Sequence, residues 1–233
     1  MDIYETELPI RDDLRAAQEA TVLGWSRPGT WWTGEQRLAI VTEVRRARDA
    51  DEIPPPWVRA SEVERPDLHA HALPAAAVDA IWRLTNHPGT LTADWYNKVV
   101  DGFGDHSAAL TPLEYTELVA LVAQANCIDR FADGLSLDRP TLPQPVEGEP
   151  SRSAPDGVAS RDHWVPTVES DVREVVKALS GVPAEHAASF QLAAAHYLPV
   201  SQLYDLTADR NALTRMQVEL VAARTSKLNE CFY

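Results

Sequence analysis

Three side chains near the end of the sequence, Glu219, Ser226 and Cys231, have the chemistry of a proton relay to a thiol. The spacing of seven places Glu219 and Ser226 on nearly the same face of a helix. Cys231 follows Glu219 by twelve residues, which on one unbroken helix is a rotation of roughly 120°. A helix end at Asn229 would let Cys231 turn back toward the Glu219 face. The pattern therefore predicts a general base, a hydroxyl or water as the relay, and a reactive sulfur.

The helix that carries Glu219 has a recognisable start, and so do two others. An S/T-x-x-E/Q capping box begins at Thr33, at Thr111 and at Thr214, and an amphipathic pattern follows each. Gly134 marks the end of the second of these helices. Further helices are expected over residues 11–22, 75–84, 91–100, 171–179 and 184–197. Alternating β patterns are sparse, so the sequence predicts an all-α fold.

Composition and charge exclude several classes of protein. The 233-residue chain is 45% apolar with a net charge of −14, which fits a globular protein and argues against nucleic acid and anionic membranes as partners. No apolar run approaches the roughly 18 residues of a membrane span, and the N-terminus lacks a basic leader region. Cys127 and Cys231 are too few for a disulfide framework. A cytoplasmic location is therefore expected.

Two other groups of polar residues are interpreted as structural. His69 and His71 could suggest a metal, but their spacing points them apart on a helix, and no third ligand is near in the sequence. We therefore expect neither a metal nor a cofactor. The basic residues of the helix that begins after Thr33 are more typical of a solvated face, or of ion pairs with the acidic surplus, than of an anion site. These residues are Arg37, Arg45, Arg46 and Arg48.

The chain divides at a proline-rich stretch. Residues 138–162 contain five prolines and few apolar residues, which predicts a linker or a wrapping arm between units 1–137 and 163–233. The helix that begins at Thr111 resembles the one that begins at Thr214. Aligning Glu117 with Glu219 places Asp129 at the position of Cys231. Two interpretations stay open: a duplicated helical unit whose first copy has lost its thiol, or two capped amphipathic helices that look alike.

The C-terminal residues resemble a known family. Glu219-Leu-Val-Ala, followed by Ser226-Lys-Leu-Asn-Glu-Cys-Phe-Tyr233, is similar to the carboxymuconolactone decarboxylase / alkylhydroperoxidase D (AhpD)-like superfamily, in its peroxidase-related branch. In that branch a helix carrying a glutamate leads into Leu-Asn-x-Cys-x-x-Cys-x-x-x-His. Glu219 and Cys231 match the glutamate and the first cysteine, and Ser226 matches a position that is often serine. Segments from Thr111 onward resemble longer members in which a degenerate unit precedes an active one.

This resemblance implies an AhpD-like helical fold in a homo-oligomer, with a degenerate first unit and an active second unit. It implies reduction of a peroxide or a disulfide by a Cys-x-x-Cys pair, with a thiol as the electron donor. The second cysteine and the histidine would follow Tyr233, so we expect a sequence cut off at its active-site turn; one hypothesis is a selenocysteine codon read as a stop. The nearby C-terminal carboxylate is expected to raise the pKa of Cys231 and to slow its reactions.

Two other functions stay open. Asp129 in place of a thiol favours, for the first unit, a non-catalytic helical protein that serves assembly or small-molecule binding. The superfamily also includes lactone decarboxylases. That chemistry does not need the cysteine pair, and the Leu-Asn-x-Cys motif at Leu228–Cys231 favours the redox branch.

Overall fold

Helices form nearly all of the regular structure in the computed structural model, which describes residues 3–63, 73–161, 163–172, 174–203, 205–207, 209 and 212–228. The α-helices among these residues are α1 (Asp12–Trp25), α2 (Gly34–Asp49), α3 (Ala75–Asn86), α4 (Ala93–Val100), α5 (Pro112–Gly134), α6 (Glu174–Lys177), α7 (Pro183–His196) and α8 (Arg215–Leu228). The short 3-10 helices are Ala60–Glu62, Pro88–Thr90, Gly102–Gly104 and Val200–Gln202. The all-α prediction is confirmed. The small antiparallel pair β1 (Val158–Ala159) and β2 (Thr167–Val168) was not predicted.

The three expected capping boxes are present. The Oγ1 atoms of Thr33, Thr111 and Thr214 accept hydrogen bonds from the backbone N–H three residues later, at 3.2, 3.2 and 3.4 Å. The side chain at that later position accepts a hydrogen bond from each threonine N–H. Each box satisfies backbone donors that a helix start leaves unpaired, so these helices begin where the sequence predicts. The helix expected over 171–179 is shorter, because Leu179 has a φ of 67°, outside the α-helical region.

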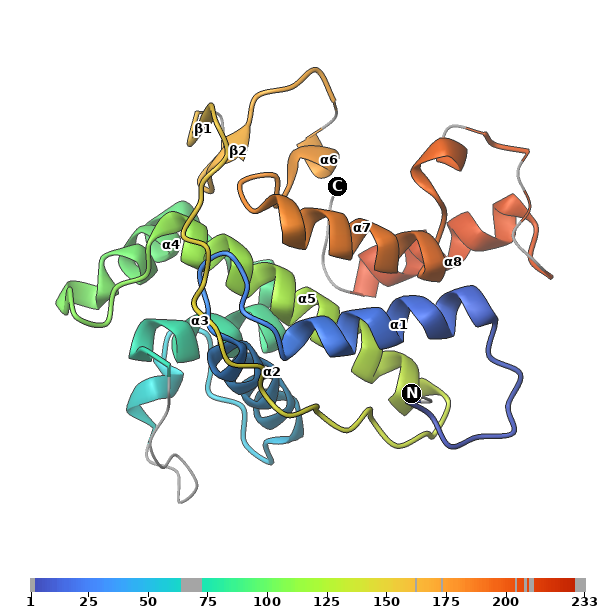
Figure 1. The fold of residues 1–233 in the computed structure, drawn as a ribbon, viewed down its shortest axis with the longest axis horizontal. Coiled ribbons are helices and arrows are strands. Elements are labelled where there is room, and N and C mark those ends of the chain that lie inside the picture. The colour runs from blue at the N-terminus through green and yellow to red at the C-terminus, as the bar shows by residue number, and fades with distance from the viewer. Residues whose placement is uncertain are drawn as a thin grey trace.

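The core lies between α2, α3 and α5, and α5 passes through the middle of the molecule (Figure 1). Apolar side chains at helical spacing meet there. Ile40 and Val44 of α2, Ile81 of α3, and Leu118 and Leu121 of α5 are fully buried. Burying each such side chain contributes about 1.5–3 kcal/mol. Helices α1 and α7 also pack against α5 and against each other, so the C-terminal part of the chain takes part in the same packing.

Residues 138–157 form no helix or strand and follow the loop between α1 and α2. The Val146 N–H donates to the Ser26 carbonyl at 2.8 Å, and the Arg152 N–H donates to the Thr30 carbonyl at 2.9 Å. These bonds hold the proline-rich segment against the same loop that lies over the buried side chain of Glu117.

Helix α8 is largely exposed. Arg215 and Val218 are its buried side chains among the described residues, whereas Met216 and Leu220 expose 81% and 71% of their surface. Val221 is exposed as well. The helix therefore presents an apolar surface that the described part of the chain does not cover.

Three residues singled out in the sequence, His69, His71 and Cys231, lie outside the described residues. Within the part of the chain that the structure describes, no three His, Cys, Asp or Glu side chains are grouped so as to hold a metal ion. No helix in the described ranges combines the length and the apolar character that crossing a membrane requires.

Candidate active site

Glu219, the expected general base, is held through one of its two oxygens. The Tyr197 hydroxyl, directly after α7, donates to Glu219 Oε1 at 2.6 Å. Arg215 Nε, one turn earlier on α8, donates to the same oxygen at 2.7 Å. No described residue donates a hydrogen bond to Glu219 Oε2. The carboxylate is therefore fixed in place while one oxygen stays available to accept a proton.

Arg215 positions this carboxylate because its own guanidinium is buried and fully engaged. Nη1 donates to the carbonyls of Gln202 and Asp205 at 3.0 and 3.2 Å, and Nη2 donates to the Leu203 carbonyl at 3.1 Å. The arginine thus ties the segment after α7 to the first turn of α8. Because Tyr197 precedes that segment, both donors to Glu219 belong to one hydrogen-bonded unit.

The two hydrogen bonds lower the pKa of Glu219. The Tyr197 hydroxyl has the largest effect, and Arg215 adds a hydrogen bond and a positive charge, while partial burial acts in the opposite direction. Burial raises the pKa of Tyr197, and its hydrogen bond to Glu219 raises it further. The Glu219 side chain is 43% exposed, so water reaches it. At neutral pH it is an ionised, solvent-accessible and rather weak base.

The structure does not bring Ser226 into contact with Glu219. Ser226 is half-buried on α8, seven residues beyond Glu219. Seven residues of α-helix span roughly 10 Å, so no direct hydrogen bond can join the two side chains. A relay that uses Ser226 therefore needs at least one water on the way from Glu219. Cys231, three residues past the end of α8, lies outside the described residues.

Glu117 and Asp129, which align with Glu219 and Cys231 in the sequence comparison of the two helices, are both fully engaged. Glu117 is buried; its Oε1 accepts from Arg37 Nη1 at 2.5 Å and its Oε2 accepts from the Trp31 N–H at 2.7 Å. Asp129, at the position of the thiol, accepts from Nε and Nη2 of Arg45, both at 2.9 Å. Neither carboxylate has an oxygen open to a substrate. The two aligned glutamates therefore differ: both oxygens of Glu117 are occupied, whereas Glu219 is held through one oxygen.

Glu117 belongs to a buried cluster that joins α1, α2, α5 and α7. Arg37 Nη1 also pairs with Glu185 Oε1 at 2.8 Å, so two carboxylates share one guanidinium. Gln124 Nε2 donates to Glu185 Oε2 at 3.0 Å, and Trp25 Nε1 donates to Gln124 Oε1 at 3.1 Å. Burial raises the pKa of Glu117, although Arg37 opposes the shift. The cluster fixes α7 against the first unit by charge as well as by packing.

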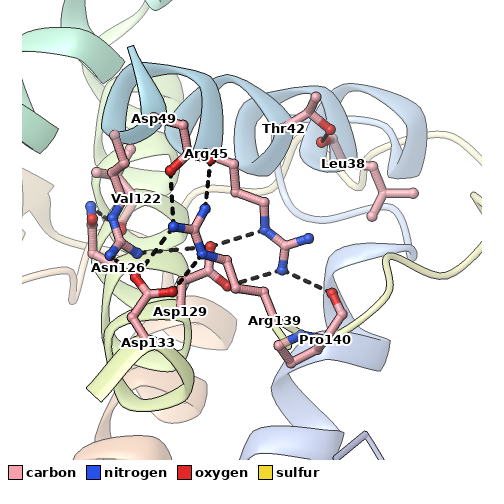
Figure 2. Close-up of polar contacts among 11 residues, drawn as sticks. Leu38, Thr42, Arg45, Asp49, Val122, Asn126, Asp129, Asp133, Arg139 and Pro140 are labelled. Atoms are coloured by element: carbon pink, nitrogen blue, oxygen red, sulfur yellow. Dashed lines mark hydrogen bonds and ion pairs between the residues drawn. The ribbon is translucent and has the colours of Figure 1, made fainter. Parts of the chain in front are cut away.

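Figure 2 shows the second set of ion pairs, around Asp129. Arg139, from the proline-rich segment, pairs with Asp49 at 2.8 Å and with Asp133 at 2.9 Å. Arg45 lies beside them on Asp129. The basic residues of α2 were expected either on a solvated face or in ion pairs. The ion pairs are confirmed, whereas a solvated face is wrong for Arg37, which is buried.

Tyr197 and Arg215 are the site residues that sequence reasoning missed. Arg215 lies four residues before Glu219, a spacing at which oppositely charged side chains meet on a helix, so this pair had a local signal. Tyr197 lies 22 residues before Glu219, and no local pattern links them.

Comparison with known proteins identifies no relative of this chain: no protein-family model, no curated protein and no solved structure matches it.

Proposed function

We propose that this chain is an AhpD-like thiol oxidoreductase of the carboxymuconolactone decarboxylase superfamily that reduces a peroxide or a disulfide at Cys231. Glu219 is the observation that carries the proposal. Its Oε1 is held by Tyr197 and Arg215, and its Oε2 accepts no hydrogen bond from a described residue. A carboxylate fixed in this way, on the helix that leads to Cys231, suits proton transfer from a thiol.

In the proposed reaction, the thiol proton of Cys231 passes through water and Ser226 Oγ to Glu219 Oε2. The thiolate attacks one peroxide oxygen, and the O–O bond breaks with its electron pair passing to the leaving oxygen, which takes up a proton. Cys231 is oxidised to a sulfenic acid, and the peroxide is reduced to an alcohol or water. A donor thiol then displaces water to form a mixed disulfide, and a second donor thiol releases Cys231.

We assign a structural, non-catalytic role to the first repeat. Its two matching carboxylates, Glu117 and Asp129, both pair with arginines of α2 and have no oxygen left for substrate. Their charge serves to hold α2, α5 and α7 together. The chemistry of the proposal therefore belongs to the second repeat alone.

We also propose that the protein works as a homo-oligomer in the cytoplasm. The exposed apolar side chains of α8, among them Met216, Leu220 and Val221, support self-association, since an apolar stripe of this kind is normally covered. A reducing compartment would keep Cys231 as a thiol between reaction cycles.

Hydrogen peroxide is expected to convert Cys231, and not Cys127, to a sulfenic acid. Cys127 on α5 is half-buried, and burial raises the pKa of its thiol to about 11. At pH 7.5 its thiolate fraction should be roughly two orders of magnitude below that of an ordinary cysteine with a pKa near 8.5. Dimedone trapping followed by peptide mass spectrometry measures both sites in one sample. Labelling of Cys127 in preference to Cys231 would contradict the proposal.

Replacing Tyr197 by phenylalanine is expected to raise the pKa of Glu219. The hydroxyl is the largest of the effects that lower this pKa, while the Arg215 contribution remains in the variant. A carboxyl 13C NMR titration of Glu219 in wild type and Tyr197→Phe measures the change. The same titration of Glu174, whose pKa is lowered chiefly by its hydrogen bond with His163, serves as the internal control and should not differ between the two proteins. An unshifted Glu219 titration would show that Tyr197 does not tune the base.

A further inference from the structure

Helix α4 packs on α3 (Figure 1). Residues of both helices line a cavity of about 480 Å³ that lies outside the residues of the proposed redox site. Its walls come from residues 53–60, from α3, from α4 and from Phe103. Its volume is within the range of small-ligand sites in proteins. Trp57, Trp82 and Trp95 are among its lining residues. The cavity therefore offers an aromatic environment of suitable size for a small molecule.

Trp57 differs from the other two tryptophans of this cavity. Trp82 and Trp95 are buried, and Trp82 Nε1 donates to Glu43 at 2.6 Å. Trp57 is 83% exposed, although it lines the cavity. It directly follows Pro54-Pro55-Pro56, whose fixed φ angles restrict the backbone that carries the indole. Trp57 therefore provides a large and mostly exposed aromatic surface next to the cavity, which suits stacking on a planar ligand.

The guanidinium of Arg83 brings a positive charge that the described residues do not neutralise. Its three nitrogens donate to neutral oxygens, namely Thr90 Oγ1 at 3.1 Å, the Pro56 carbonyl at 2.5 Å and the Thr90 carbonyl at 2.6 Å. The guanidinium carbon lies 5.1 Å from the centre of the Trp95 ring. Burial alone lowers the pKa of Arg83. No described carboxylate lies within ion-pair distance of this arginine, so an anionic ligand would find an unneutralised cation here.

Lys98 adds a second cation to this cavity. It extends from α4, lines the cavity, and makes no ion pair with any residue that the structure describes. The carboxylate of Asp94 lines the cavity too and offsets one of the two charges. The lining thus has three basic side chains, Arg59, Arg83 and Lys98, against two carboxylates, Asp79 and Asp94, in a chain with a net charge of −14.

The other cation in the wall, Arg59, is already paired with carboxylates. Arg59 Nε donates to Asp79 Oδ2 at 2.8 Å, and Arg59 Nη1 donates to Glu62 at 2.7 Å. Ser61 donates to both oxygens of Asp79. The Arg59 guanidinium also lies over the Phe103 ring at 4.3 Å. Arg83 and Lys98 are therefore the lining cations that make no ion pair with a described carboxylate, and they can select an anionic ligand.

We propose that this cavity binds a small planar aromatic carboxylate. The carboxylate would lie against Arg83 and Lys98, and the ring would stack on Trp57. A guanidinium in a fixed orientation matches the two oxygens of a carboxylate, and desolvation strengthens the pairing. The ligand is expected to contain an aromatic ring because an aliphatic acid would leave the exposed surface of Trp57 uncovered.

Benzoate binding to the full chain, measured by isothermal titration calorimetry, tests this proposal. Benzamide and acetate are the matched probes, because benzamide lacks the charge and acetate lacks the ring. The variants are Trp57→Ala and Lys98→Gln, both at exposed positions where substitution should leave the fold intact. Trp164→Ala, at another exposed tryptophan outside this cavity, is the matched control.

Saturable benzoate binding is expected, about tenfold or more tighter than that of either benzamide or acetate. Trp57→Ala and Lys98→Gln should each weaken benzoate binding by about fivefold or more, and Trp164→Ala should leave it unchanged. Benzoate binding should also weaken as the salt concentration rises. The proposal would be overturned if benzamide or acetate bound as tightly as benzoate, or if Trp57→Ala or Lys98→Gln kept wild-type affinity for benzoate. It would also be overturned if benzoate binding did not saturate at 10 mM, which is about the weakest binding that titration resolves.

Discussion

Replacing Arg37 by methionine is expected to lower the free energy of unfolding by about 3–5 kcal/mol. Nη1 of Arg37 lies 2.5 Å from Glu117 Oε1 and 2.8 Å from Glu185 Oε1, and all three side chains are buried. Methionine retains much of the aliphatic volume but leaves two carboxylates in the core without a cation. Urea unfolding at pH 7, followed by far-UV circular dichroism, measures the loss.

The control for Arg37→Met is a triple variant that adds Glu117→Gln and Glu185→Gln. It removes both negative charges together with their cation, while the amides can keep part of the hydrogen bonding to Trp31 and Gln124. If unpaired charge causes the instability, the triple variant should recover most of the lost stability. A triple variant as unstable as Arg37→Met would mean that the arginine acts through packing instead.

The same cluster should make stability depend on pH. Burial raises the pKa of Glu117 in the folded state above its ordinary value of 4.5. The folded protein then binds this proton more tightly than the unfolded chain, so stability increases as the pH falls from the raised pKa toward 4.5 and decreases toward neutral pH. In Glu117→Gln this contribution is absent, and the slope of unfolding free energy between these pH values should become smaller. A slope unchanged by the substitution would contradict the assignment.

Replacing Glu219 by glutamine is expected to slow oxidation of Cys231 by hydrogen peroxide by about 10²-fold, the lower end of the range for a positioned general base. Glutamine keeps the shape of the side chain but cannot accept the thiol proton. The lower end is expected because Tyr197 and Arg215 lower the pKa of the carboxylate and weaken it as a base. Time-resolved alkylation of Cys231 at pH 7.5, in a Cys127→Ser background, measures the rate.

Glu117→Gln is the matched control for this experiment, because it makes the same change at the glutamate that aligns with Glu219 in the sequence. Both oxygens of Glu117 are occupied by Arg37 and Trp31, so its replacement should leave the rate at Cys231 unchanged. If Glu117→Gln and Glu219→Gln slowed the oxidation of Cys231 equally, the effect would be a general structural one. If Glu219→Gln did not slow the oxidation, Glu219 would not be the general base.

Helix positions were predictable from sequence because their signals are local. The threonines at positions 33, 111 and 214 form capping boxes with a residue three positions later, and all three boxes are present in the structure. The helix expected over 171–179 is present but shorter, because the positive φ at Leu179 cannot be inferred from a hydrophobic pattern. The pairing of β1 with β2 could not be predicted from the sequence either, because strands of only two residues show no alternating pattern.

The candidate site was only partly predictable, because its partners are distant in the chain. Glu219 could be singled out from its spacing to Cys231, but the Tyr197 hydroxyl that holds it belongs to the end of another helix. Glu117 reads as the equivalent of Glu219 along the sequence. Its different role depends on Arg37, which lies 80 residues away and meets it only after α2 and α5 pack together.

The most direct test of the account is the rate at which hydrogen peroxide oxidises Cys231 in the folded protein, compared with a synthetic peptide of residues 226–233. The peptide has the same neighbouring residues but lacks Glu219, Tyr197 and Arg215. The account predicts that Cys231 in the Cys127→Ser protein reacts about tenfold or more faster than the peptide thiol at pH 7.5. Equal rates would mean that the fold does not activate this thiol and would contradict the proposed oxidoreductase.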